Sequence, residues 1–420
     1  MKLDIKSFLI NFLSGLFIIL SFINFNGCSS NNDISLSIEE SFNNTNIPAV
    51  SMGYYIRGEE EEFFNFGNAL WEENKKVTPD HIFRIASMTK VITSVGAMQL
   101  VERGMITLDE PVKKILPIMD KIKILDDLGN LVEPKNEITL RHLLTHTAGF
   151  AYAFTSNKLN DFTNGEWAAD SSIWNYNEYP GLDFHESVRI FDSGKEFRYG
   201  ANTDWVGIII EQVSELSLED YLRKNITGPL GMDKTWFNVP EELSHLIVDY
   251  GNRQDNGEII SNNDRVSPKT TKYYGGGGLQ SSPSDYMIFL KCLLNYGELD
   301  GVKILKRETV ETMIANHLDG NLIYENTKFP SVNFNAGKNG TFFDEKDKWS
   351  LAWAIENNPK EKFRPIGTGY WAGYFNSYFT INYDEQMIIV YFTQFTPFND
   401  KESYSLFKEF EKILINKYFN

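Results

Sequence analysis

The stretch from Phe83 to Gly104, FRIASMTKVITSVGAMQLVERG, constrains the fold more than any other part of this 420-residue chain. Its apolar residues do not keep to one face of a helix; they are Val91, Ile92, Val95, Ala97, Met98 and Leu100. A helix that is apolar on so many sides lies at the centre of a domain. We therefore expect a central helix with Ser87 in its first turn and Lys90 at its buried end.

Ser87 and Lys90 form an S-x-x-K motif. Residues three apart lie on one helix face, so the serine hydroxyl and the lysine amine can meet. A hydroxyl becomes a nucleophile when a base removes its proton, and a lysine kept neutral by burial can be that base. The motif alone is weak, because roughly two chance matches are expected in a chain this long. The alternative is a surface serine beside a solvated lysine.

Composition excludes several classes of protein. The net charge of −17 argues against nucleic acid and against an anionic membrane surface, because both bind basic patches. The chain has two cysteines, Cys28 and Cys292, which excludes a disulfide framework. Cys292 lies in the apolar segment YMIFLKCLLNYG and is expected to be a small core residue.

Residues 1–28 have the pattern of an export signal. Lys2 and Lys6 precede a long apolar run that ends near Asn26-Gly27-Cys28. The pattern resembles a bacterial lipoprotein signal, in which Cys28 would be lipidated and would become the mature N-terminus. The alternative is an uncleaved membrane anchor. Either reading predicts an exported protein of a bacterial cell envelope, facing the periplasm or the cell surface, with residues 29–36 as a polar tether.

Strand patterns gather at the two ends of the remaining chain. The sequence predicts strands at 49–58 and 63–69, three more at 349–356, 374–381 and 386–394, and a final amphipathic helix at 403–418. The segment between them reads as mostly helical. We expect an α/β (α+β) domain over 37–420, in which both chain ends build an antiparallel sheet flanked by helices. The sheet lobe would span about 37–100 and 265–420, and an all-helical lobe would span about 101–264.

Other polar clusters are assigned no chemistry. His142 and His146 are four apart in LRHLLTHTAGF, but no third ligand lies at a telling distance, so we expect structural histidines and no metal site. Gly275–Gly278 is expected to be a glycine-rich strand rather than a phosphate loop, because no G-K-[ST] follows. Residues 151–182 and 318–348 are expected to shape a pocket.

The order of S-x-x-K, a tyrosine in the helical lobe and a small-residue motif on a late strand resembles the serine β-lactamase and penicillin-binding protein superfamily. The chain is most similar to the class C-like branch, which holds family VIII carboxylesterases and D-alanyl-D-alanine carboxypeptidases. The resemblance covers about residues 45–415. Four further stretches agree in order: ITLRHLLTHTAGF, LEDYLRKNITGPLGMDKTWF, GGGGLQSSPSDYMIFLKCLLNYGELDG and GTGYWAGYFNSYFTINYDEQMIIVYFTQ.

This resemblance assigns roles to individual residues. It implies that Ser87 is the acyl-accepting nucleophile, that Lys90 is its partner, and that Tyr199 lies near both. Whether Lys90 or Tyr199 is the general base stays open, since a phenol beside an ammonium can also accept a proton. The backbone N–H groups of Ser87 and Tyr374 would form the oxyanion hole. No cofactor is implied.

Two departures from the β-lactamase pattern bear on the substrate. Ala201 stands where β-lactamases carry the asparagine of Tyr-x-Asn, and Asn202 comes one residue late. Trp371-Ala372-Gly373 replaces Lys-Thr-Gly and is similar to the Trp-Gly-Gly of the esterase branch. A tryptophan offers a ring face and one N–H donor instead of a cation, which favours a neutral or apolar substrate.

The sequence therefore predicts a serine hydrolase that acts on small acyl esters through an acyl-enzyme. One alternative is a D-amino-acid peptidase, a carboxypeptidase or a β-lactamase-type hydrolase; another is a non-catalytic penicillin-binding-like sensor. Transfer of the acyl group to an alcohol is also open. The expected partner is a small-molecule acyl ester or peptide, with no nucleic acid, and with membrane contact only through the lipid anchor.

Overall fold

A computed structural model describes residues 26–59, 61–162, 188–262, 264–318, 320, 342, 344, 346–358 and 364–419. The chain divides into two compact units, Met1–Thr45 and Asn46–Asn420. The first contains helix α2 (Asn26–Asn43), which begins well before the helix expected from residue 37. Residues 29–36, expected to form a polar tether, are thus helical, because Ile34 and Ile38 lie four apart and extend the apolar face of the helix.

No helix among the described residues is long and apolar enough to cross a membrane. Most of the expected export signal, residues 1–25, lies outside the described part of the chain, and the side chain of Cys28 does too. The lipoprotein assignment therefore stays a prediction.

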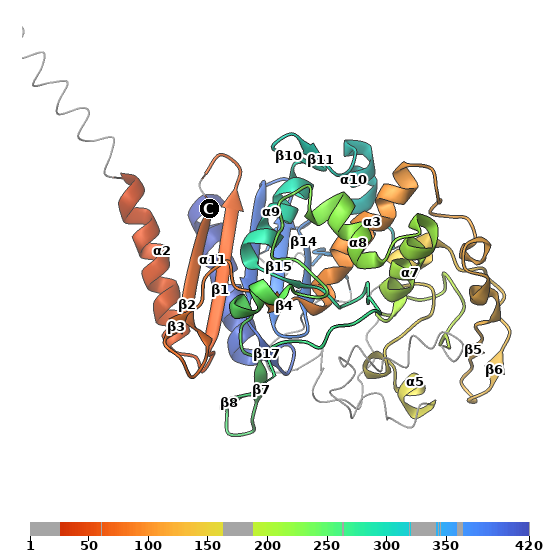
Figure 1. Cartoon of the computed structure of the whole chain (residues 1–420), viewed down its shortest axis with the longest axis horizontal. Helices are drawn as coiled ribbons and strands as arrows, with labels where there is room; N and C mark the ends of the chain where they lie inside the picture. The colour runs from red at the N-terminus through yellow and green to blue at the C-terminus, as the bar shows by residue number, and fades with distance from the viewer. Residues whose placement is uncertain are drawn as a thin grey trace, which may run out of the picture. The chain divides into compact units, whose positions relative to one another are not determined.

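An eight-stranded sheet forms the centre of the second unit, and both ends of that unit contribute strands to it (Figure 1). Its order is β12 (Lys348–Trp349), β13 (Ala354–Ile355), β14 (Gly369–Gly373), β15 (Ser377–Asn382), β16 (Met387–Phe392), β1 (Ala49–Ile56), β2 (Glu62–Leu70) and β3 (Lys75–Lys76). All neighbouring strands are antiparallel. The predicted antiparallel sheet from both ends is confirmed, with 349–356 forming a short hairpin instead of one strand.

Alternating side chains of this sheet pack against helices on its two faces, as the period of a strand requires. Tyr378 of β15 stacks on Phe407 of α11 (Lys401–Phe419), with ring centroids 4.8 Å apart. The next residue, Phe379, contacts Tyr286 of α9 (Pro283–Leu294) at 5.6 Å. The sheet is therefore a middle layer between α11 and α9.

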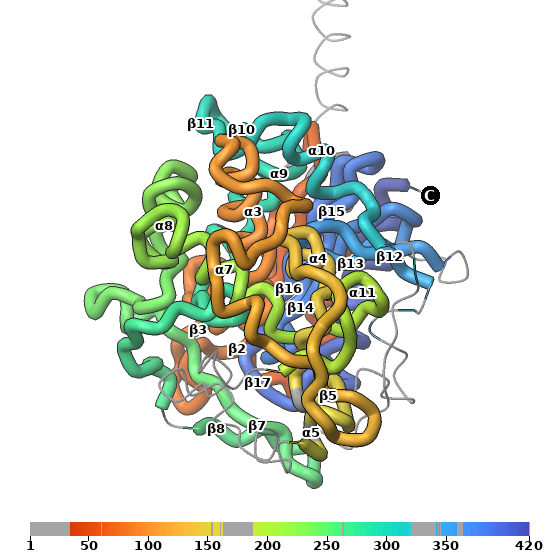
Figure 2. Tube along the Cα trace, turned by 90° about the vertical axis from the view of Figure 1, so that its right-hand side faces the viewer, coloured from red at the N-terminus to blue at the C-terminus, as the bar shows by residue number. Residues whose placement is uncertain are grey.

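The other α-helices of the described residues are α3 (Thr89–Glu102), α4 (Leu140–Leu144), α5 (Asn157–Phe162), α7 (Asn202–Ser214), α8 (Leu218–Leu222) and α10 (Arg307–Ile314). Those from α4 to α8 lie in the inserted lobe. Figure 2 looks onto the side where α3, α4 and α7 lie together. The lobe is not entirely helical, because it also contains the hairpin of β5 (Ile124–Leu125) and β6 (Leu131–Val132).

Three other small sheets are present in the described residues, of which the β10–β11 pair is a local hairpin and the other two join distant segments. They are β4 (Phe83–Arg84) with β9 (Gln280–Ser281), β10 (Glu298–Leu299) with β11 (Val302–Lys303), and β17 (Phe395–Thr396) with β7 (Gly251–Arg253) and β8 (Ile259–Ser261). The third sheet ties residues 251–261, assigned by sequence to the helical lobe, to the strand that follows β16. Cys292 is a fully buried core residue, as predicted.

A buried group of charges lies between the sheet and α11. Arg364 donates two hydrogen bonds to the carboxylate of Glu411, at 2.9 and 2.8 Å, and lies 3.8 Å from Glu356. Burial raises the pKa of Glu356 to about 7 from its ordinary 4.5; Arg364 opposes this rise and Asp347 adds to it. Between about pH 4.5 and pH 7, the folded protein therefore keeps a proton on Glu356 that the unfolded chain has already lost.

This shift predicts a pH dependence of stability. A carboxyl whose pKa is higher in the folded state stabilises the fold below pH 4.5, and that contribution is lost as the pH rises to about 7. The free energy of unfolding of wild type should fall across that window relative to Glu356→Gln. Urea titrations at several pH values would measure the difference, and parallel curves for the two proteins would contradict the prediction.

Candidate active site

The start of α3 is fixed by contacts from two distant segments. β4 pairs with β9, and the Ile85 N–H donates to the Leu279 carbonyl at 3.1 Å. From the other side β14 comes so close that a Cβ on Gly373 would lie 2.5 Å from the Ile85 carbonyl oxygen. The glycine of the Trp371-Ala372-Gly373 motif thus allows the strand to touch the chain just before Ser87.

Ser87 lies in a single 3-10 turn, η1 (Ala86–Met88), which leads directly into α3. The preceding residue, Ala86, has a φ of +42°, a conformation that non-glycine residues seldom adopt and that often marks a functional site. The sequence expectation of Ser87 in the first turn of a buried helix is confirmed, with the first turn tighter than α-helical.

The amine of Lys90 lies at the centre of the site. Its Nζ donates to Ser87 Oγ at 3.3 Å and to the Gly276 carbonyl at 2.5 Å. The two side chains are almost fully buried, with Lys90 2% exposed and Ser87 9% exposed. The alternative of a surface serine and a solvated lysine is therefore wrong. The arrangement can move a proton between the hydroxyl and the amine.

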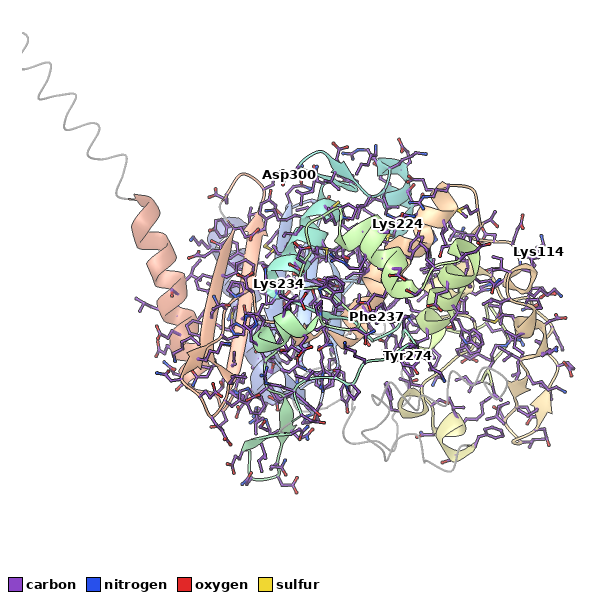
Figure 3. All side chains as sticks on the ribbon, viewed as in Figure 1. Lys114, Lys224, Lys234, Phe237, Tyr274 and Asp300 are labelled. Carbon is purple, nitrogen blue, oxygen red and sulfur yellow. The ribbon has the colours of Figure 1, made fainter. Side chains whose placement is uncertain are left out.

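Residues 275–278 form a turn and not the strand expected from sequence. The N–H groups of Gly277 and Gly278 both donate to the carbonyl of Tyr274, which Figure 3 labels together with Phe237. Gly278 packs so tightly on Phe237 that a Cβ there would lie 2.7 Å from its ring. Close packing on both sides explains the run of glycines, and the turn presents its carbonyls to α3.

Hydrogen bonds from α3 hold this turn in register. Thr93 Oγ1 donates to the Gly275 carbonyl at 2.8 Å, and Thr89 Oγ1 accepts from the Leu279 N–H at 3.1 Å. Together with the bond from Lys90 to the Gly276 carbonyl, they attach the turn and the residue that follows it to one helix at three points.

Tyr199, carried by the segment before α7, faces the amine as the sequence predicted. Lys90 Nζ lies 4.7 Å from the centroid of the Tyr199 ring. Trp371 Nε1–H donates to the Tyr199 hydroxyl at 3.4 Å, and the two rings lie 4.9 Å apart. The predicted residues Ser87, Lys90, Tyr199 and Trp371 therefore come together, but the tryptophan donor contacts Tyr199, where the sequence had assigned it to substrate.

The histidines have structural surroundings. His142 forms a capping box with Thr139 at the start of α4. His146 is buried against the Tyr199 ring at 4.8 Å, and burial, with Lys90 nearby, holds its pKa well below the ordinary value. His146 is therefore a neutral wall of the site. Among the described residues no group of His, Cys, Asp or Glu is arranged to hold a metal ion.

The late asparagine points away from the reacting groups. Asn202 Nδ2 lies 2.9 Å from His146 Nδ1 and donates to the Phe150 carbonyl at 2.8 Å. Its amide ties α7 to the chain that follows α4, so it does not replace the β-lactamase asparagine. Ala201, at the position of that asparagine, has no side-chain donor or acceptor to offer.

Sequence reasoning missed two buried residues of the site. The Tyr152 hydroxyl lies 3.3 Å from Lys90 Nζ and donates to Asp204 Oδ2 at 3.4 Å. Tyr152 lies near the start of the segment that the sequence assigned to a pocket-forming loop, and its one signal was its place two residues after HTAGF. Asp204 had a clearer signal, because it is an isolated acid at the start of the apolar helix NTDWVGIII.

Most of the two segments expected to shape the pocket, within 151–182 and 318–348, lies outside the described residues. The described parts that contact the site include Tyr152 and Thr155 from the first, the latter donating to the Tyr199 carbonyl at 2.7 Å, and Phe342 from the second, whose ring lies 5.6 Å from that of Trp371. The walls around the reacting groups are thus strongly aromatic.

Comparison with known proteins places these observations among relatives. The family model described as Beta-lactamase matches residues 37–408. Monacolin J acid methylbutanoyltransferase from Aspergillus terreus is 30% identical over 348 residues, which cover 80% of this chain and 82% of that protein. Lovastatin esterase from Penicillium rubens is 31% identical over 252 residues, covering 57% of this chain and 60% of that protein.

A solved structure agrees with the sequence relatives. Simvastatin synthase from Aspergillus terreus, as the LovD6 mutant, superposes with a TM-score of 0.77 at 27% sequence identity. The match covers 92% of this chain and 95% of that one. The antiparallel sheet, its flanking helices and the inserted lobe are therefore common to both.

Proposed function

Because this chain belongs to the beta-lactamase family, whose members similar to it include an acyltransferase and an esterase, we propose that it forms an acyl-enzyme on Ser87 and releases small carboxylic acids from neutral esters. The observation that carries the proposal is the 3.3 Å contact between Lys90 Nζ and Ser87 Oγ inside a buried aromatic site. A buried amine beside a hydroxyl is an arrangement for activating a nucleophile.

Acylation would proceed as follows. Ser87 Oγ attacks the ester carbonyl while its proton passes to Lys90, and the resulting ammonium gives the proton to the leaving alcohol. Water then attacks the acyl-enzyme and loses a proton to the same amine. The bond from the acyl carbon to Ser87 Oγ breaks as the ammonium returns that proton to Oγ, which releases the acid and restores both side chains. Tyr199 faces Lys90 through its ring and is supported by Trp371, so it would steady the amine or share its proton.

The oxyanion that forms during each attack needs donors. We assign this role to the backbone N–H groups of Ser87 and Tyr374, which belong to segments that meet where Gly373 touches Ile85. Each such donor contributes roughly 3 kcal/mol to lowering the barrier in comparable sites. Any side chain at position 373 would separate the two segments and weaken the hole.

The substrate class follows from what the site lacks. Trp371 stands in place of a lysine, and Ala201 in place of an amide, so neither a substrate carboxylate nor a substrate amide is matched at these positions. Aromatic rings of Trp371, Tyr199 and Tyr152 instead favour an apolar acyl or alcohol group. This supports ester chemistry over β-lactam or D-peptide hydrolysis.

A second candidate is transfer of the acyl group to an alcohol other than water. The relative that is named monacolin J acid methylbutanoyltransferase favours it, because that name describes transfer of a short acyl group. The two activities share the acyl-enzyme and differ only in the acceptor. They are therefore distinguished by how the acyl-enzyme divides between water and an alcohol, and not by the catalytic residues.

A panel of donors and acceptors tests both candidates. Wild type should hydrolyse p-nitrophenyl acetate and butyrate with a kcat/KM at least about 100-fold higher than for nitrocefin or a D-alanyl-D-alanine peptide. The reason is that the carboxylate and amide of the latter two are left unmatched in the site, which is expected to cost about 3 kcal/mol. Added alcohols that raise nitrophenol release and yield a new ester would reveal transfer. Turnover of the D-peptide without ester turnover would contradict the proposal. No labelling by a fluorophosphonate probe would instead indicate a non-catalytic sensor.

A further inference from the structure

Behind Lys90, four groups close a ring of hydrogen bonds that the sequence did not predict. Lys90 Nζ contacts the Tyr152 hydroxyl at 3.3 Å, and that hydroxyl donates to Asp204 Oδ2 at 3.4 Å. The other carboxylate oxygen, Oδ1, accepts from the Gly276 N–H at 2.8 Å. The carbonyl of Gly276 accepts from Lys90 at 2.5 Å and completes the ring.

The carboxylate of Asp204 is buried with the amine. Asp204 is 3% exposed and Lys90 is 2% exposed. A Cβ on Gly276 would lie 2.6 Å from Asp204 Oδ2, so only a glycine admits the carboxylate at this distance. Asp204 and Lys90 are joined through the Tyr152 hydroxyl and through Gly276, and the charge of Lys90 acts on the Asp204 carboxyl. Buried charges are costly unless they are compensated in this way.

Electrostatic coupling between the two groups is mutual. Burial raises the pKa of the Asp204 carboxyl, while Lys90 and the hydrogen bonds from Gly276 and Tyr152 act in the opposite direction. If the ammonium favours the carboxylate, the carboxylate favours the ammonium by the same free energy. Each charge therefore stabilises the other whenever both are present.

We propose that Asp204 is a positioning residue that supplies the buried counter-charge for Lys90 when Lys90 takes the proton of Ser87. The inference rests on the function proposed above. As the bond from Ser87 Oγ to the acyl carbon forms, the proton moves to Lys90 Nζ and creates a cation, which is neutralised when the proton passes to the leaving oxygen. Asp204 lowers the free energy of that cation without touching substrate, and Tyr152 links the two groups.

Other titratable groups that face Lys90 do not supply this charge. Ser87 and Tyr152 contact its amine directly, and Tyr199 presents its ring face. His146, whose pKa is held well below its ordinary value by burial, is neutral near pH 7. Asp204 on α7 is the acid that acts on Lys90 from the packed elements that the structure describes.

Asp204→Asn tests the inference through the pH dependence of serine reactivity. The amide keeps an acceptor for the Gly276 N–H but removes the charge. An amine that loses an opposite charge beside it becomes harder to protonate, so the acid limb of the pH profile for fluorophosphonate labelling should move to lower pH. The plateau rate should fall at least about tenfold, because the forming cation has lost its partner. Asp204→Ser, which also lacks the charge, should move the limb in the same direction.

Asp285→Asn is the matched control. Asp285 is also buried, its pKa is also raised by burial, and it accepts hydrogen bonds from the Lys234 N–H and the Thr235 hydroxyl, at 2.7 and 2.8 Å. Its replacement should leave the acid limb of the labelling pH profile in place. It should lower thermal stability as much as the Asp204 variants do. If the Asp204 variants react more slowly with an unmoved limb, Asp204 is only structural and the inference is overturned. If wild type is not labelled at any pH, the proposed function fails instead.

Discussion

Replacing Ser87 by alanine is expected to lower kcat for p-nitrophenyl butyrate by about 10⁴-fold or more. Removing the hydroxyl oxygen removes the atom that would carry the acyl group. Among the described hydrogen-bond partners of Lys90, the other hydroxyl is the phenol of Tyr152. The fold should survive, since alanine is smaller and the turn around residue 87 is fixed by backbone contacts. Steady-state kinetics and a thermal melt would measure both effects.

Ser94→Ala is the control for that experiment. Ser94 is a buried serine on the same helix, 2% exposed, about one turn beyond Lys90. Its replacement should change kcat less than threefold, because the described hydrogen bonds of Lys90 go to Ser87, Tyr152 and Gly276 and not to Ser94, and should alter stability by about 1 kcal/mol or less. Equal losses in the two variants would mean that any perturbation of α3 is sufficient, and the assignment of Ser87 would then fail.

Replacing Lys90 by arginine is expected to lower kcat by about 10³-fold and thereby to settle which group is the base. Arginine keeps a positive charge but does not lose a proton at accessible pH, so it cannot take the proton of Ser87. Lys90→Met, which removes both charge and base, should be at least as slow. If Lys90 served only to favour the phenolate of Tyr199, the arginine variant would keep activity within about tenfold of wild type.

The controls for the lysine variants address packing. Arginine is larger than lysine, and the ring of contacts to Gly276 and Tyr152 is tight, so thermal stability must be compared with that of the methionine variant. A Lys291→Met variant serves as the reference. Lys291 lies on α9, and its described ion pair is with Glu61, at 3.0 Å, and not with a residue of the site. Its kcat should match wild type.

Local patterns were enough to predict the parts of the site that lie close in sequence. Ser87 and Lys90 are three apart on one helix, so their contact follows from helix geometry alone. The strands at both chain ends were predictable from their period, and the turn joining β15 and β16 from its short polar loop. Tyr199 and Trp371 came from resemblance to a known family, since nothing local in the sequence brings residues 90, 199 and 371 together.

The remaining contacts depend on backbone groups and on tertiary packing. Gly276 acts through its carbonyl and its N–H, which any residue type possesses, so its sequence signal was only the absence of a side chain. Asp204 lies near Lys90 because α7 packs against α3, and the sequence does not specify that pairing. Tyr152 and Trp371 come from other segments, the chain after α4 and strand β14, and sequence reasoning had aimed the Trp371 N–H at substrate and not at Tyr199.

The most direct test of the account is to trap the acyl-enzyme. Wild type mixed with p-nitrophenyl butyrate, quenched in acid during turnover and digested, should yield one peptide heavier by the mass of a butyryl group. Fragmentation should locate that group on Ser87, and the peptide should be unmodified in Ser87→Ala. A butyryl group on any other residue, or ester turnover with no adduct under conditions where deacylation limits the rate, would contradict the central claim.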